Sequence, residues 1–182
     1  MNKNTIVINL FGSPGTGKST LMAEIFQKLK WLNIDCEMAP EFAKELVWEN
    51  RMDTLKDQIY VFSKQNHNIY RLNGKVDIII TDSPILLSIL YHKLHHTYEH
   101  PTLYKLIHET FDSYNNWNFL LKRTKPYNTN GRFQTEHESD QLYNVLVDLL
   151  DEMFINYSKL DSDMNTSDKI VDLVVQKINE NL

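Results

Sequence analysis

A short glycine-rich stretch carries the clearest chemistry in this sequence. Gly12 is followed, after four intervening residues, by Gly17, Lys18 and Ser19, which completes the pattern G-x-x-x-x-G-K-[ST]. The glycines let backbone N–H groups turn inward around phosphate oxygens. Lys18 can contact the β- and γ-phosphates of a nucleotide, and the Ser19 hydroxyl can ligate magnesium. We therefore predict an ATP and Mg²⁺ site whose nucleotide-binding residues are Gly12, Ser13, Pro14, Gly15, Thr16, Gly17, Lys18, Ser19 and Thr20.

The segments on either side of this loop support the same interpretation. Residues 5–11 are a short, β-branched apolar run that ends at a glycine, which is typical of a buried parallel strand. Residues 18–31 carry apolar side chains at helical spacing, and the amino end of a helix places its positive dipole end at a bound anion. The alternative, a chance glycine turn, does not require this strand–loop–helix order.

Two carboxylates are expected near the same phosphate site. Asp82 directly follows residues 76–81, the clearest core strand, where it could hold magnesium or position the attacking group; the alternative is that it caps the next helix. Glu41 follows a weaker strand at residues 35–38 and could accept a proton from an attacking hydroxyl, or only stabilise the dipole of its own helix. We predict catalytic roles for Lys18, Glu41 and Asp82, with Ser19 and Asp82 as the metal ligands.

Residues 122–133 form a polar, basic segment punctuated by Pro126 and Gly131, which predicts a loop or a mobile flap. It contains four cations within eleven residues, namely Lys122, Arg123, Lys125 and Arg132. Arginines from a closing lid can neutralise the charge that phosphoryl transfer spreads over phosphate oxygens. We predict Arg123 and Arg132 as catalytic lid residues; a solvated basic loop is the alternative.

Strands that alternate with helices predict the α/β class, with a parallel sheet covered on both faces, in a single domain over residues 1–182. The expected strands are residues 5–11, 35–38, 76–81, 117–121 and 154–158. The expected helices are residues 18–31, 41–50, 54–73, 85–94, 102–114, 134–151 and 167–178.

Other candidate residues have simpler explanations that stay open. Aromatic side chains on the helices after Glu41 (Trp48, Tyr60 and Phe62) could stack on a base, or could pack in the core. Four histidines lie close together at 92, 95, 96 and 100, but no cysteine or carboxylate set completes a metal-binding pattern, which favours a solvated loop.

Composition sets outer limits on function. The chain has 182 residues, a hydrophobic content of 42% and a net charge of −5, which does not favour sequence-blind nucleic-acid binding but leaves a local basic patch open. Cys36 is the single cysteine, which indicates a reducing compartment, and no apolar run is long enough for a membrane span. We expect a cytoplasmic protein (in a host cytoplasm if it is viral) with no membrane partner.

Four blocks resemble a phage-encoded family of kinases within the thymidylate-kinase superfamily. They are residues 8–20, residues 41–48, residues 76–87, and Lys125-Pro126-Tyr127 with Gly131-Arg132. The characterised members of that family are 5-hydroxymethyluracil DNA kinases, which phosphorylate the hydroxymethyl group of a modified base in phage DNA. The family is also similar to the kinase domain that phosphorylates nicotinamide riboside.

The resemblance implies a P-loop NTPase three-layer sandwich with a central five-stranded parallel sheet in the order 2-3-1-4-5 and a lid. It further implies an ATP- and magnesium-dependent kinase with a hydroxyl acceptor, most simply a modified base in DNA. A free nucleoside or nucleoside monophosphate is the second choice of acceptor, and a non-catalytic nucleotide switch is the alternative class. Self-association as a homodimer stays open.

Overall fold

The computed structural model describes residues 3–96, 98–128 and 135–180. Five parallel strands form one sheet in the order β2-β3-β1-β4-β5, which confirms the predicted architecture. The strands are β1 (Ile6–Phe11), β2 (Cys36–Met38), β3 (Ile78–Thr81), β4 (Asn115–Arg123) and β5 (Ser158–Ser162). Ile8 of β1 pairs with Ile80 of β3 on one side and with Trp117 of β4 on the other. Strand β1 is therefore the central strand of the sheet, and its carboxyl end leads into the glycine-rich loop.

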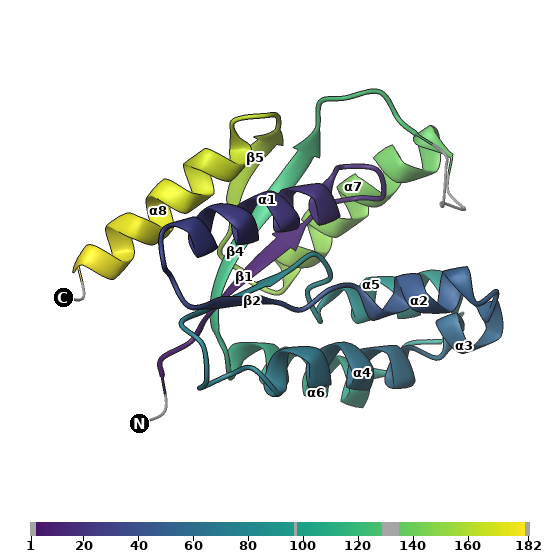
Figure 1. The fold of residues 1–182 in the computed structure, drawn as a ribbon. Helices are drawn as coiled ribbons and strands as arrows, with labels where there is room; N and C mark the ends of the chain where they lie inside the picture. Colours follow the sequence, from purple (N-terminus) through teal and green to yellow (C-terminus); the bar gives the residue numbers. More distant parts are fainter. Residues whose placement is uncertain (1–2, 97, 129–134, 181–182) are drawn as a thin grey trace.

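Eight helices in the described ranges cover this sheet on both faces (Figure 1). They are α1 (Lys18–Trp31), α2 (Phe42–Trp48), α3 (Met52–Lys56), α4 (Gln58–Tyr70), α5 (Leu87–His95), α6 (Pro101–Asp112), α7 (Glu136–Glu152) and α8 (Thr166–Glu180). Every residue of β1 and β3 is buried, because helices cover both faces of the sheet, as is usual for parallel sheets. None of the described helices is long and apolar enough to cross a membrane.

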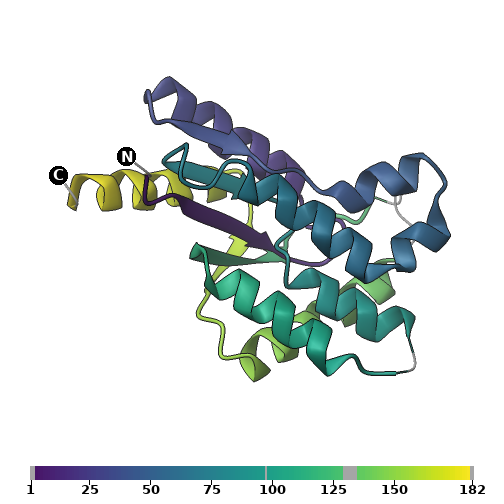
Figure 2. The same ribbon diagram turned by 90° about the horizontal axis from the view of Figure 1, so that it is seen from below.

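Alternate residues of the strands enter two separate cores. Ile6, Ile8 and Leu10 of β1 pack with side chains of α1 and α8 on one face, whereas Val7 and Phe11 pack with α4, α5, α6 and α7 on the other. Figure 2 shows α1 and α8 on one side of the sheet and α6 and α7 on the opposite side. The same view places α2 and α3 beyond the carboxyl end of the strands, where they can wall a ligand site.

Three boundaries differ from those predicted from the sequence. The predicted helix over residues 54–73 is two helices, because Asp57 ends α3 and its carboxylate accepts from the backbone N–H of Tyr60 at 3.2 Å to start α4. The predicted strand over residues 154–158 is wrong: Phe154 has a left-handed φ of 55° at the end of α7, and the polar β5 follows it. Lys122 and Arg123 belong to β4, so the basic loop begins at Thr124.

Candidate functional site

The loop between β1 and α1 has the backbone that phosphate binding requires. Gly15 has a φ of 82°, and Gly17, which precedes the first turn of α1, has a φ of 99°. L-residues with a side chain rarely adopt these angles, so glycine is needed at both positions. The amino end of α1 therefore opens directly onto the loop, and its unpaired backbone N–H groups favour an anion there.

Three side-chain hydroxyl groups donate hydrogen bonds to backbone carbonyls of the loop. Thr16 Oγ1 donates to the Ser13 carbonyl at 2.6 Å, within the loop itself. Ser139 Oγ of α7 donates to the Pro14 carbonyl at 2.7 Å, and Ser162 Oγ at the end of β5 donates to the Thr16 carbonyl at 2.6 Å. The loop is therefore bonded to two distant parts of the chain before any ligand enters it.

The sequence analysis did not predict that Ser139 and Ser162 support the loop, although the position of Ser139 in its helix could have indicated it. Ser139 stands in line with Leu142, Leu146 and Leu149, which form the buried stripe of α7. A fully buried serine in an apolar stripe needs a hydrogen-bond partner, and here the partner is the phosphate loop. Ser162 ends a polar edge strand, where nothing in the sequence distinguishes it.

Lys18 and Ser19 occupy the positions that the motif predicts. Lys18 Nζ donates to the Gly12 carbonyl at 2.8 Å and to the Ser13 carbonyl at 3.2 Å, so the ammonium group lies across the loop. Lys18 and Ser19 are partly buried and line a cleft of about 430 Å³ together with Glu41. A charged amine and a hydroxyl group thus face the same space as a carboxylate.

Asp82 and Glu41 are brought together at the carboxyl edge of the sheet. Asp82 is almost fully buried, and its Oδ1 accepts from the backbone N–H of Glu41 at 3.0 Å. The first turn of α5 has no side-chain cap, so Asp82 does not play the capping role that was its alternative. Glu41 precedes α2 but makes no capping bond with its side chain. Both carboxylates are therefore held near the loop without serving as helix caps.

Burial raises the pKa of the Glu41 carboxyl group above its ordinary value of 4.5. The positive charge of Lys18 opposes this effect, the negative charge of Asp82 adds to it, and Lys44 opposes it more weakly. A carboxyl group whose pKa moves toward neutrality is a better proton acceptor for an alcohol than one with an ordinary value. The environment of Glu41 is thus suited to a general base.

We expect Glu41→Gln to lower kcat by about a hundredfold, the scale of general-base catalysis. If Glu41 is the base, the unaltered protein should lose activity as the pH falls through the raised Glu41 pKa, because only the ionised carboxylate accepts a proton. The glutamine variant should lack that acid limb, which a pH profile of kcat/KM measures. A variant that keeps both the rate and the acid limb would leave Glu41 as a helix-start residue only.

Arg123, the last residue of β4, pairs with acidic side chains of α7. Arg123 has a side chain only 12% exposed and pairs with two carboxylates of α7, Glu136 at 2.6 Å and Asp140 at 2.7 Å. These bonds, that to Asp140 first, hold the pKa of Arg123 above its usual range. Arg123 therefore ties β4 to α7, and its contact with phosphate stays a prediction. Arg132 lies outside the described residues.

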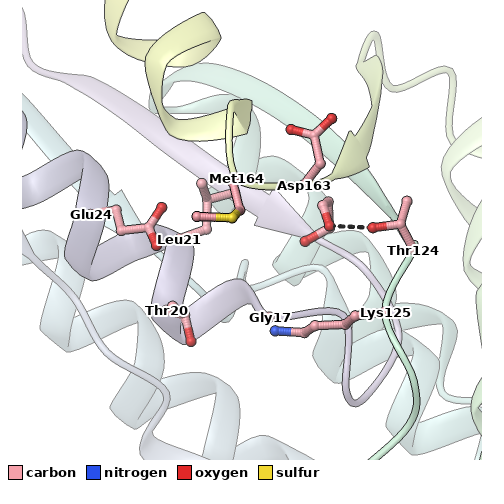
Figure 3. A pocket seen from close by; sticks show the side chains of 9 residues that line it. Gly17, Thr20, Leu21, Glu24, Thr124, Lys125, Asp163 and Met164 are labelled. Carbon is pink, nitrogen blue, oxygen red and sulfur yellow. Dashed lines mark hydrogen bonds between the residues drawn. The ribbon is translucent and has the colours of Figure 1, made fainter.

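Among the described cations of this segment, Lys125 lies at the phosphate loop. A methyl group built on Gly17 would stand 2.9 Å from Lys125 Nζ, so the ammonium group lies against the backbone of the loop. Figure 3 shows the Lys125 side chain reaching toward Gly17 from the strand side. The sequence analysis named Lys125 as part of the basic segment but did not single it out, because arginine was preferred there.

A second hollow of about 330 Å³ adjoins the loop at Gly17 (Figure 3). It lies between α1, which contributes Thr20 and Glu24, and the turn between β5 and α8, which contributes Asp163 and Met164. The Asp163 carboxylate accepts from the Asn165 backbone N–H at 2.8 Å and so is engaged at the start of α8. Both this hollow and the cleft are lined by Gly17, Thr20 and Lys125. The two spaces therefore meet at the phosphate loop.

The aromatic residues and histidines considered in the sequence analysis lie partly in the cleft and partly in the protein core. Trp48 is exposed and lines the cleft, whereas Phe62 is a core residue and Tyr60 packs edge-on against Phe42. His92 is buried, and its Nδ1 lies 2.9 Å from the Tyr104 hydroxyl. Among the residues that the structure describes, no three or more histidine, cysteine, aspartate or glutamate side chains form a group that could hold a metal ion.

The fold, the glycine-rich loop and the lysine across it define a P-loop NTPase. A family model described as an AAA domain matches residues 7–166, and the chain belongs to this family. A search of curated proteins finds no match. Among solved structures, the chain is similar to the NadR protein in complex with NR, with a TM-score of 0.67 and 16% sequence identity. That match covers 93% of this chain and 51% of the other, so the chain spans about half the length of the protein it matches.

Proposed function

We propose that this protein is an ATP- and magnesium-dependent kinase that transfers the γ-phosphoryl group to a hydroxyl group of a nucleoside or nucleobase. One observation carries the proposal: a single cleft is lined by Lys18 and Ser19 of the phosphate loop and by Glu41, whose backbone is bonded to Asp82. A nucleotide switch needs the loop but not a proton acceptor in the same cleft. The likeness to the NadR protein supports the fold of a P-loop kinase.

In the proposed reaction the acceptor oxygen attacks the γ-phosphorus, and the bond from that phosphorus to the β–γ bridging oxygen breaks. The bridging oxygen keeps the electron pair and leaves as part of ADP. Glu41 takes the proton of the acceptor hydroxyl, and the Lys18 ammonium group stabilises charge on the phosphate oxygens. The Ser19 hydroxyl and the Asp82 carboxylate would supply hard oxygen ligands of the kind that magnesium prefers. Bound magnesium would neutralise charge on the β- and γ-phosphates.

The acceptor ranked first is the hydroxymethyl group of 5-hydroxymethyluracil in DNA, because the sequence blocks resemble kinases with that substrate. A free nucleoside or a nucleoside monophosphate ranks second. The described surface of α2, α3 and α4 offers no excess of positive charge for a DNA backbone, since residues 42–70 contain four lysines and arginines and four aspartates and glutamates. Because this surface has no net positive charge to attract DNA, a free nucleoside stays a candidate acceptor.

The acceptor can be identified with γ-labelled ATP and a panel of acceptors. The panel contains hydroxymethyluracil in an oligonucleotide, the same unit as a free nucleoside, and common nucleosides and nucleoside monophosphates. With DNA as the acceptor, KM should rise steeply with salt concentration, because phosphate contacts release counterions. Label on the free nucleoside alone would replace the DNA acceptor by the second choice, and label on no hydroxyl acceptor would remove the kinase proposal.

We also propose that the segment from Thr124 to residue 133 closes over bound nucleotide as a lid. Lys125 of this segment already lies against Gly17, so a phosphate in the loop would meet its ammonium group. Hydrogen exchange should slow in this segment when a non-hydrolysable ATP analogue is added. Peptides from α6, which contributes nothing to either hollow, serve as the control. Equal exchange with and without the analogue would remove the lid.

A further inference from the structure

Arg123 and Lys125 stand two residues apart but have opposite surroundings. The Arg123 side chain is 12% exposed, and two carboxylates of α7 hold its guanidinium group. Lys125 is exposed, and its ammonium group has no carboxylate partner within the described ranges. That group lies against Gly17, at the loop where the phosphates of a nucleotide would bind. One of these cations is therefore neutralised in place, and the other can meet an anion.

The guanidinium group of Arg123 also contacts the segment that carries Lys125. Its Nη1 atom has two hydrogens, so it can donate both to Glu136 at 2.6 Å and to the Lys125 carbonyl at 3.3 Å. Its central carbon lies 5.4 Å from the centre of the Tyr127 ring, within the range of a cation–π contact. A planar, forked group makes these contacts at once, which the ammonium group of a lysine could not match. Arg123 thus holds the chain at Lys125 and again at Tyr127.

Helix α7 connects this guanidinium group to the phosphate loop. Glu136, Ser139 and Asp140 lie three and four residues apart, so they share one face of the helix. The carboxylates of this face accept from Arg123, with Asp140 Oδ1 2.7 Å from Nη2. The Ser139 hydroxyl group between them donates to the Pro14 carbonyl at 2.7 Å. The same turn of helix therefore holds Arg123 and the phosphate loop in one frame.

A second route ties the segment to the loop through the end of β5. Thr124 Oγ1 donates to the Ser162 carbonyl at 2.6 Å, beside Lys125 (Figure 3). Ser162 Oγ in turn donates to the Thr16 carbonyl of the loop at 2.6 Å. The two residues that precede Lys125 are thus each bonded to the loop through one intermediate element. This arrangement fixes where the Lys125 backbone stands relative to the loop.

A direct contact between Arg123 and a phosphate would be costly in this arrangement. The guanidinium group would have to release a carboxylate, and charge-assisted hydrogen bonds of this kind are strong. A phosphate brought to it would also stand beside Glu136 and Asp140, whose negative charges repel it. Lys125 has no ion pair to break among the described residues. The geometry therefore favours Lys125 as the phosphate contact and Arg123 as its support.

We propose that Arg123 is a positioning residue, which places the Lys125 ammonium group at the phosphate loop and acts on the nucleotide through it. This role differs from the direct phosphate contact that the sequence predicted for Arg123. It rests on the proposed function for the reaction, but ATP binding alone is enough to test it. It also assigns Glu136 and Asp140 as the residues on which the position of Arg123 depends.

A double-mutant cycle in nucleotide affinity tests this role. Lys125→Met, Arg123→Met and the double variant are titrated by calorimetry with a non-hydrolysable ATP analogue and magnesium. We expect each single variant to bind about tenfold more weakly, the scale of one hydrogen bond to a charged group, and the double variant to bind no more weakly than Lys125→Met. A double variant about a hundredfold weaker would show two independent contacts and overturn the proposal. Unchanged affinity of Arg123→Met would overturn it as well.

Removal of the two carboxylates gives opposite results for the two roles of Arg123. In Glu136→Gln with Asp140→Asn, an arginine that contacts phosphate itself would be released, and the analogue should bind more tightly. A positioning arginine would instead lose its place, so we expect binding about tenfold weaker, as in Arg123→Met. Both carboxylate side chains are well exposed, at 58% and 60%, so this variant serves if Arg123→Met does not fold. Tighter or unchanged binding would overturn the proposal.

The matched control is Asp148→Asn with Glu152→Gln. These exposed carboxylates have the same spacing at the other end of α7, so their loss removes the same charge and should leave the affinity unchanged. Thermal unfolding checks that each variant folds. No measurable binding of the analogue by the unaltered protein would overturn the role of Arg123. A non-additive cycle without label transfer to any acceptor would remove the kinase proposal alone, whereas transfer with an additive cycle would remove only the role of Arg123.

Discussion

Lys18→Ala should lower kcat by about a hundredfold or more while the protein keeps its fold. Charge stabilisation at a transferring phosphoryl group is worth about 3 kcal/mol per donor, and each ~1.4 kcal/mol is a factor of ten in rate. The fold should survive because the carbonyls of Gly12 and Ser13, to which the Lys18 amine donates, belong to the loop itself. Ser139 and Ser162 hold the loop independently of it.

The matched control for this experiment is Lys75→Ala. Lys75 is exposed in the turn before β3, at the opposite end of the sheet, and lines neither hollow. Its loss should leave kcat and KM for ATP near their original values. Circular dichroism and the unfolding temperature report on the fold of both variants. A folded Lys18→Ala protein with near-normal turnover would show that the loop binds nucleotide without taking part in catalysis.

Asp82→Asn should lower kcat by about a hundredfold at ordinary magnesium concentration and raise the magnesium concentration needed for half-maximal rate. In the unaltered protein, Asp82 Oδ1 accepts a hydrogen bond from the Glu41 backbone N–H at 3.0 Å. The asparagine side chain has nearly the same size, and its oxygen can still accept this bond. What is lost is the negative charge that a hard cation requires. The measurement is initial rate against magnesium concentration at saturating ATP.

Asp77→Asn is the control for Asp82, because both carboxylates belong to the β3 region but at opposite ends. Asp77 precedes β3 and accepts from Lys3 Nζ at 3.2 Å, far along the strand from the phosphate loop. Its replacement should not change the dependence on magnesium. If Asp82→Asn behaves like Asp77→Asn in this assay, Asp82 only orders the start of α2 through its bond to Glu41.

The features that sequence predicted well are those with local causes. A β-branched run that ends at Gly12 and a second apolar run that ends at Asp82 are the two central strands, because buried parallel strands need continuous apolar side chains. The glycines of the loop require φ values that few other residues adopt, so their spacing predicts backbone geometry directly. The two strands and the loop could therefore be predicted from the residues themselves, whereas the sheet order was implied by the resemblance to a known family.

The features that sequence did not predict depend on contacts between distant segments. β5 is a polar edge strand, and only its pairing with β4 makes it a strand, so the apolar residues before it were misleading. The sequence also did not predict that Glu136 and Asp140 of α7 pair with the guanidinium group of Arg123. The supports of the loop by Ser139 and Ser162 also join residues more than a hundred positions apart.

The central claim is that this cleft transfers a phosphoryl group to a hydroxyl acceptor instead of only binding or hydrolysing ATP. Its most direct test is the stoichiometry between ADP formed and phosphate gained by a hydroxymethyluracil acceptor, as nucleoside and as oligonucleotide, followed by mass spectrometry. We expect one phosphate on the acceptor hydroxyl for each ADP, with Lys18→Ala lowering both together. ADP and free phosphate produced at the same rate with or without acceptor, and no phosphorylated acceptor, would contradict the claim.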